Sequence, residues 1–124
     1  VRNMSFALTT EQVLARTKLV TRRQGWLKLK VGDMVQPVRK CMGLRPGEKV
    51  ERIGGPIRIT GLRREVLAMM TRDLDYGIAE CALEGFEHHP TYRWPSEFVA
   101  MFCNTHGNCT PHSMITRIAF IYED

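Results

Sequence analysis

Short stretches in which apolar and polar residues alternate occur through the first half of the chain and again at its end. A period of two residues is typical of a strand with one buried face. In residues 57–62, for example, Ile57, Ile59 and Gly61 share one face, while Arg58 and Thr60 share the other. The pattern predicts strands at residues 5–8, 19–21, 34–38, 49–52, 57–62 and 115–122.

The period becomes helical after residue 64. Apolar residues at positions 66, 67, 70 and 74 fall on one stripe, and the helical pattern continues over residues 76–83 until Gly85. The hydroxyl groups of Thr9 and Thr10 suit the start of a short helix that ends near Arg16. Pro95 predicts the first turn of another helix.

The order of these elements is strand, helix, several strands, helices and a final strand. It predicts an α+β fold, namely a mixed, mostly antiparallel β-barrel with helices packed on one side. A chain of 124 residues fits a single domain, and no internal repeat is visible. Met4 is a candidate start, which would leave residues 1–3 as an extension of this 1–124 domain.

Composition narrows the class of protein. Hydrophobic residues make up 44% and charged residues 25% of the chain, as in globular proteins. No apolar run reaches the roughly 18 residues of a membrane helix, and the first residues lack the apolar region of a secretory signal. We therefore expect a cytoplasmic protein without a membrane partner, with its four cysteines reduced.

The net charge of +5 favours a polyanionic partner, of which nucleic acid is the commonest. The alternative is a charge that serves solubility alone. The densest basic cluster spans residues 16–23, where the first predicted helix passes into a strand.

Within this cluster, Thr21 and Arg23 project to one face of the predicted strand and Arg22 to the other. Lys18 lies at the preceding turn and can reach the face of Thr21. Such a trio can hold a phosphate or polarise a carbonyl, and a lysine can activate a threonine hydroxyl. The alternative is a solvated basic edge strand.

The segment 18–23, followed by Trp26 and by the turn 31–33, resembles the signature of the ASCH family, in particular of its phage and prophage members. The family pattern is Gly-x-Lys-x-x-Thr-x-Arg, followed by a Gly-Asp turn into a strand. Segments 82–86 and 117–120 also resemble the family, so the resemblance covers nearly the whole chain. Arg16 replaces the glycine of the pattern, which favours an open, phosphate-facing surface over a tight pocket.

The resemblance implies a PUA-like barrel with a cleft between barrel and helices, and RNA or a nucleoside as ligand. Some bacterial members hydrolyse the acetyl amide of N4-acetylcytidine, and another has been assigned ribonuclease activity. Carried over from the amidohydrolases, Lys18 would deprotonate Thr21, whose oxygen attacks the acyl carbon, and Glu84 would pass a proton to the leaving amine. Glu80 and Glu87 are alternatives to Glu84. No cofactor is implied.

Further side chains are candidates for ligand binding or for metal binding. Trp26, Tyr92 and Trp94 can stack on a base or pack in the core. Besides RNA binding and hydrolysis, a third possible function is that of a phage or host protein-interaction domain. The expected RNA or ligand contacts are Arg16, Arg22, Arg23, Trp26, Lys28 and Lys30. Four side chains are candidate zinc ligands, namely Cys103, His106, Cys109 and His112. Their spacing lacks the long insert between the ligand pairs of ordinary zinc fingers, so we expect them to stay metal-free.

Overall fold

The computed structural model describes residues 1–123. The strands are β1 (Arg2–Ser5), β2 (Val20–Arg23), β3 (Met34–Val38), β4 (Ile57–Val66) and β5 (Met114–Tyr122). The α-helices are α1 (Thr10–Leu14), α2 (Met69–Arg72), α3 (Leu74–Cys81) and α4 (Pro95–Thr105). A 3₁₀ turn, η1 (Ala7–Thr9), precedes α1, and a π-helical turn, η2 (Ala82–Phe86), follows α3.

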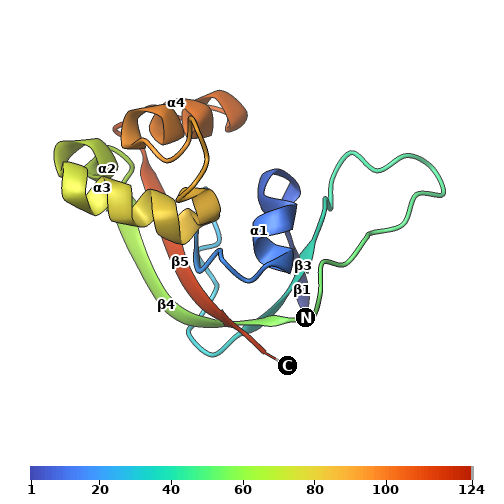
Figure 1. Cartoon of the computed structure of the whole chain (residues 1–124). Helices are drawn as coiled ribbons and strands as arrows, with labels where there is room; N and C mark the ends of the chain where they lie inside the picture. The colour runs from blue at the N-terminus through green and yellow to red at the C-terminus, as the bar shows by residue number, and fades with distance from the viewer. Residues whose placement is uncertain (124) are drawn as a thin grey trace.

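The strands form one mixed sheet in the order β1-β3-β4-β5-β2, in which β1 is parallel to β3 and the other neighbours are antiparallel. The long strands β4 and β5 are curved, and a register shift between Ile59 and Gly61 marks a bulge in β4 (Figure 1). Within residues 1–123, β1 and β2 are the edge strands and do not pair with each other. The α+β class is confirmed, whereas closure of the sheet into a barrel is not.

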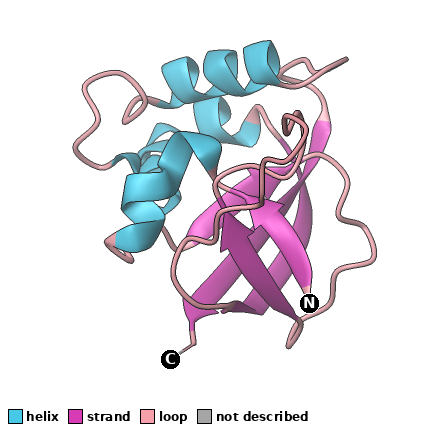
Figure 2. Cartoon of the chain, turned by 90° about the vertical axis from the view of Figure 1, so that its right-hand side faces the viewer, coloured by secondary structure: helices cyan, strands magenta, loops and turns pink. Residues whose placement is uncertain are grey.

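The helices lie on one side of the sheet, as Figures 1 and 2 show. Helices α2, α3 and α4 pack together over one end of β4 and β5, and α1 lies over the other end. Each group covers its own apolar cluster. The first cluster, which α1 covers, includes Met4, Phe6, Val13, Ile57, Ile59, Ile118 and Phe120. The second includes Leu67, Met70, Cys81, Phe86, Phe98, Phe102 and Ile115.

Local sequence accounts for the helical layer. Asp73 interrupts the helical segment with extended backbone, and its carboxylate caps α3 by accepting from the Tyr76 N–H. A Cβ at position 77 would lie 1.8 Å from the Met70 carbonyl oxygen, so only glycine lets α3 approach α2 this closely. Gly85 has φ +100° and bends the end of η2. Pro95 occupies the first turn of α4, as predicted.

Several predicted boundaries are wrong. The first strand covers residues 2–5 rather than 5–8, because the chain turns at Phe6, whose carbonyl accepts from the Thr10 hydroxyl. Residues 49–52 form no strand, and only Arg52 bridges to Val38. Strand β4 continues to residue 66, where it still pairs with β5, so the predicted 66–74 helix starts at Met69 instead.

The predicted strand at 34–38 and the helical pattern over 76–81 are confirmed, and the final strand begins at Met114. None of the helices described for residues 1–123 has the length and apolar character needed to cross a lipid bilayer.

Candidate ligand-binding cleft

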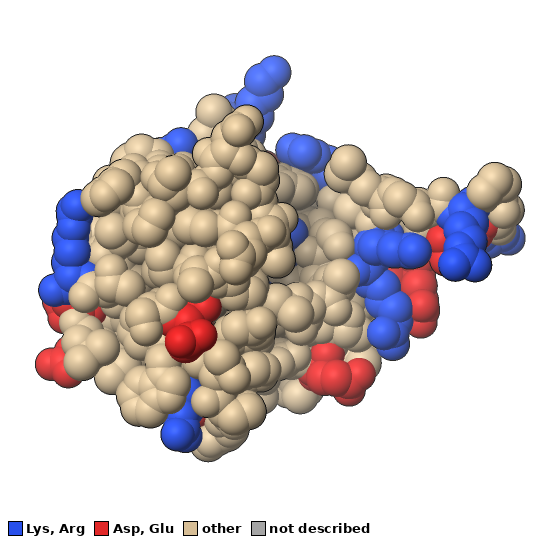
Figure 3. Space-filling view, turned by 90° about the horizontal axis from the view of Figure 1, so that it is seen from above, with Lys and Arg blue, Asp and Glu red and all other residues tan. Residues whose placement is uncertain are grey.

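A cleft of about 410 Å³ lies where β2 meets η1, η2 and α4. Seen from above, the molecule is hollowed between its two halves, and basic side chains lie in and around the hollow (Figure 3). The polar side chains of the cleft include Lys18, Thr21, Arg22, Arg23 and Glu84. Its apolar and aromatic walls include Phe6, Phe86, Phe98, Met101, Phe102 and His106.

The alternation of β2 places Thr21 and Arg23 on the same face, as predicted. The Nε of Arg23 donates a hydrogen bond of 3.0 Å to the Thr21 hydroxyl oxygen. Strand β2 is held against η2 by a hydrogen bond of 2.8 Å from the Leu19 N–H to the Leu83 carbonyl. This contact brings the chain at residue 84 beside the chain at residue 18.

Lys18 and Glu84 form a buried ion pair, with exposed side-chain fractions of 3% and 4%. The Lys18 ammonium donates to the Glu84 carboxylate and to the Glu84 backbone carbonyl, each at 2.8 Å. Burial lowers the pKa of Lys18 below its ordinary value, while the Glu84 carboxylate opposes this change. The pair is thus an ammonium held next to a group able to accept its proton.

Glu84 is also bound from the other side by Arg22, whose side chain is fully buried. The two Nη atoms of Arg22 donate only to protein groups. Burial acts to lower the pKa of Arg22, but the surrounding carboxylates outweigh it and raise the pKa. The acceptors are Glu84 at 3.3 Å, Glu65 at 3.0 Å, Glu80 at 2.6 Å and the Tyr76 hydroxyl at 3.2 Å.

The outer carboxylates of this network have further cations. Arg117 donates to Glu80 at 3.0 Å, and Arg63 donates to Glu65 at 3.3 Å. The Nε of Arg22 has no hydrogen-bond partner among the described residues, although it is buried. Arg22 therefore borders the cleft, but the hydrogen bonds of its guanidinium go to buried protein groups.

Arg23 differs from its neighbours because it forms no ion pair with a carboxylate in the part of the chain that the structure describes. Its guanidinium carbon lies 4.7 Å from the ring centroid of Phe6. Burial lowers the pKa of Arg23 to about 10, against the opposing effect of Glu84. The side chain is still charged at neutral pH, so the cleft has one cation without an anionic partner.

The predicted catalytic trio of Lys18, Thr21 and Glu84 therefore lines one cleft. Over residues 1–123, however, no hydrogen bond joins the Lys18 ammonium to the Thr21 hydroxyl. Of the competing glutamates, Glu80 lies beneath Arg22 and Glu87 is exposed, so Glu84 is the one in contact with Lys18.

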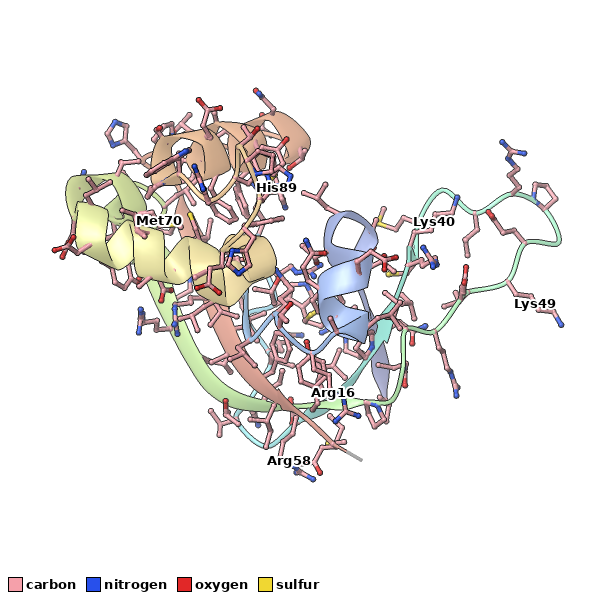
Figure 4. The ribbon with its side chains drawn as sticks, viewed as in Figure 1. Arg16, Lys40, Lys49, Arg58, Met70 and His89 are labelled. Carbon is pink, nitrogen blue, oxygen red and sulfur yellow. The ribbon has the colours of Figure 1, made fainter. Side chains whose placement is uncertain are left out.

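Four of the predicted ligand contacts lie outside the cleft. Arg16 contacts the Tyr122 ring at 5.5 Å and has φ +60°, a conformation that favours glycine over residues with a side chain. Figure 4 shows it far from the helical layer around Met70. Trp26 packs against the first core cluster beneath the Arg2 guanidinium. The other two predicted contacts, Lys28 and Lys30, are exposed and do not line the cleft.

The other candidates serve packing or lie at the surface. Tyr92 stacks on His89 with a centroid separation of 4.5 Å, and Trp94 is exposed at the start of α4. His106 stacks on Phe102 at 3.9 Å and lines the cleft. Among the described residues, no three His, Cys, Asp or Glu side chains form a group that could hold a metal ion.

Sequence reasoning missed the cleft-facing side of α4 and the pairing of Glu65 and Glu80 with Arg22. The spacing of Phe98, Met101 and Phe102 predicts a buried helix face, but it does not show that this face borders a cleft. Glu80 is a candidate only as an alternative to Glu84, and no local pattern shows that Glu65 and Glu80 are buried, because their burial depends on where α3 meets the sheet.

Comparison of the chain with protein-family models, curated proteins and solved structures finds no match. The chemistry of the cleft is therefore the basis for a functional assignment.

Proposed function

We propose that the cleft binds a single nucleoside unit, either free or at an unpaired position of an RNA. The observation that carries this proposal is the charge of Arg23, which has no ion-pair partner among the described residues, in a cleft whose walls are mostly apolar. Its volume of about 410 Å³ falls within the usual range for small-molecule sites. His106 lines the cleft and is partly exposed, whereas the phenylalanine rings are each only 2% exposed. We expect a base to lie against His106, because sequence-tolerant recognition of unpaired bases relies on stacking.

The polar floor supplies complementary hydrogen bonding. Arg23 has donors left for a phosphate or a carbonyl after its bond to Thr21. Glu84 can accept from an exocyclic amine, while Lys18 and Arg22 hold it in place. The net charge of +5 and the resemblance to the ASCH family, with its PUA-like barrel, agree with this ligand class.

Direct binding measurements test the proposal. Calorimetry with cytidine and cytidine monophosphate should give saturable binding, and Arg23→Met should weaken the nucleotide about 10- to 100-fold, as expected for losing a charged hydrogen bond. Arg45→Met removes the same charge from an exposed loop position and serves as the matched control. Equal effects of the two substitutions, or no saturable binding of either ligand, would refute the proposal.

Binding of a labelled single-stranded RNA distinguishes a free nucleoside ligand from a nucleoside unit that belongs to an RNA. If the unit belongs to an RNA, affinity measured by fluorescence anisotropy falls steeply as salt rises, because phosphate contacts release counterions. A free nucleoside should show almost no such dependence.

Hydrolysis of an acylated nucleoside amide is the second candidate, and it is favoured by the convergence of Lys18, Thr21 and Glu84 in one cleft. Lys18 would give its proton to Glu84 and then take the proton of Thr21. The Thr21 oxygen would attack the acyl carbon, the amine would leave with a proton from Glu84, and water would hydrolyse the ester. The missing Lys18–Thr21 hydrogen bond means that Lys18 must turn toward Thr21 when substrate is bound.

Chromatography of N4-acetylcytidine after incubation with the protein tests this step through the appearance of cytidine. Thr21→Val should abolish turnover with little change in the fold, since the two side chains have nearly the same shape. Binding without turnover in the wild-type protein would leave the binding proposal standing and remove hydrolysis of this substrate.

A further inference from the structure

The sulfur atoms of Cys103 and Cys109 lie 3.7 Å apart near the end of α4, in a part of the molecule that the proposed function does not use. Cys103 belongs to the last turns of α4, and Cys109 belongs to the loop that leads to β5. Both are reduced and partly buried against the second core cluster. The two other cysteines are separate, because Cys41 is exposed and Cys81 is fully buried in the core.

The chain reversal that follows α4 brings the two sulfurs together. Helix α4 ends at Thr105, His106 is extended, and Asn108 adopts the left-handed conformation at φ 54°. The helix is anchored in the core through Phe98 and Phe102, so Cys103 is the fixed partner. A Cβ at Gly107 would meet no atom within 4 Å, so there is free space at the turn two residues before Cys109.

We propose that Cys103 and Cys109 form a reversible disulfide, with a low-molecular-weight disulfide as the oxidant. A sulfur–sulfur bond measures about 2.05 Å, so the pair must close by about 1.7 Å. Movement of the 107–109 loop supplies this closure without displacing the anchored helix. The pair also lacks a third metal-ligating side chain among the residues that the structure describes, which favours covalent closure over metal binding.

The reaction is an ordinary thiol–disulfide exchange with oxidised glutathione. One cysteine thiolate attacks a sulfur of the oxidant, forming a mixed disulfide and releasing one glutathione thiolate. The second cysteine then loses its proton and displaces the other glutathione. In total the pair gives up two electrons and two protons, and one oxidised glutathione becomes two glutathione molecules.

The charge state of the thiols sets the rate of this exchange. Burial, followed by the contact with Cys109, raises the pKa of Cys103. Because the thiolate is the attacking form, the exchange is expected to be slow at neutral pH. Incubation at pH 8 for several hours is therefore the appropriate condition for the test.

The full chain with Cys41→Ser, which replaces the exposed thiol, is the protein to test. It is incubated with oxidised glutathione, the remaining thiols are alkylated, and the intact mass is measured. We expect the number of alkylated thiols per denatured chain to fall from three to one, and peptide mapping to join Cys103 to Cys109. Adding reduced glutathione in excess should restore all three.

Two further variants provide the control. With either Cys103→Ser or Cys109→Ser in the same background, the exchange should stop at the mixed disulfide, and the attached glutathione should remain. A pairing that involves Cys81, a disulfide between chains, or an unchanged thiol count in the Cys41→Ser protein would overturn the proposal. So would stoichiometric zinc that is lost in either single variant.

Discussion

Replacing Arg22 with methionine should destabilise the protein more than any surface substitution, because this side chain connects three buried glutamates. Methionine keeps most of the length and apolar volume of arginine but removes the guanidinium. Glu84, Glu80 and Glu65 would each lose one cation, although each keeps another, namely Lys18, Arg117 and Arg63 respectively. The buried carboxylates would thus be only partly compensated.

The contacts set the size of this effect. Removing one partner of a buried ion pair usually destabilises a protein by about 3–5 kcal/mol. Since the carboxylates keep other cations, we expect the lower end, about 3 kcal/mol, out of a total stability on the order of 5–15 kcal/mol. For a domain of this size, that loss lowers the melting temperature by roughly 10–15 °C.

The pH dependence of the loss identifies its cause. Although burial raises the pKa values of Glu65 and Glu80, hydrogen bonds and cations outweigh it and hold them below their ordinary value of 4.5. The stability that these groups contribute is present above that pH and disappears as pH falls through the lowered values. Without Arg22, both pKa values rise relative to the wild type, because one of the groups that lowers them is lost. The difference between variant and wild type should therefore be largest near pH 7.5 and shrink toward pH 4, as the carboxylates of the variant take up protons first.

Urea unfolding followed by circular dichroism at these two pH values measures the effect. Arg45→Met, at an exposed position, should change the free energy of unfolding by less than about 0.5 kcal/mol. Arg22→Lys should be intermediate, because an ammonium cannot reproduce the fork of the guanidinium. If Arg22→Met loses less than about 1 kcal/mol at pH 7.5, or the same amount at both pH values, the buried network does not stabilise the fold as inferred.

Two smaller predictions concern the elements that position the cleft. Gly77→Ala should lower the melting temperature by several degrees at least, because its Cβ would lie 1.8 Å from the Met70 carbonyl oxygen. Gly107→Ala is the control: its Cβ would meet no atom within 4 Å, so the same thermal melt should show little change. Tyr122→Phe should cost about 1 kcal/mol in urea unfolding, since the Lys18 carbonyl loses a donor at 2.6 Å. Burial raises the pKa of Tyr122 to about 12, so in an absorbance titration this tyrosine should ionise above the ordinary phenol range.

The parts of the fold that were predictable have a strong local cause. Pro95 fixes the start of α4, and the period of two places Thr21 and Arg23 on one face of β2. Residues 49–52 also look like a strand, yet a strand needs a continuous partner, and only the single bridge between Arg52 and Val38 forms. The pairing of Val66 with Met114 likewise overrides the helical pattern at the end of β4. Long-range pairing of this kind is not encoded in a short window of sequence.

The same distinction applies to the cleft. Local spacing predicts that the Lys18, Thr21 and Arg23 side chains converge, whereas Glu84 is indicated only by the resemblance to the ASCH family. Arg22 was expected to face away from Thr21 and to contact a ligand. Its face is instead covered by α3, and the guanidinium is enclosed by carboxylates from distant elements. A basic run therefore predicts where charge lies along the chain but not which charges are compensated after folding.

The charge of Glu84 should also influence whether the cleft prefers a nucleotide or a nucleoside, and the Glu84→Gln substitution tests this directly. In the wild-type protein, Glu84 neutralises Lys18 and repels an anion placed near Arg23. A glutamine retains a carbonyl that accepts from Lys18 but has no charge. Affinity for cytidine monophosphate relative to cytidine should therefore rise on the order of tenfold, as expected for removing one negative charge from a partly buried site. Calorimetry with both ligands measures this ratio. Because damage to the cleft would weaken both ligands alike, an unchanged ratio would show that the charge of Glu84 plays no part in ligand choice.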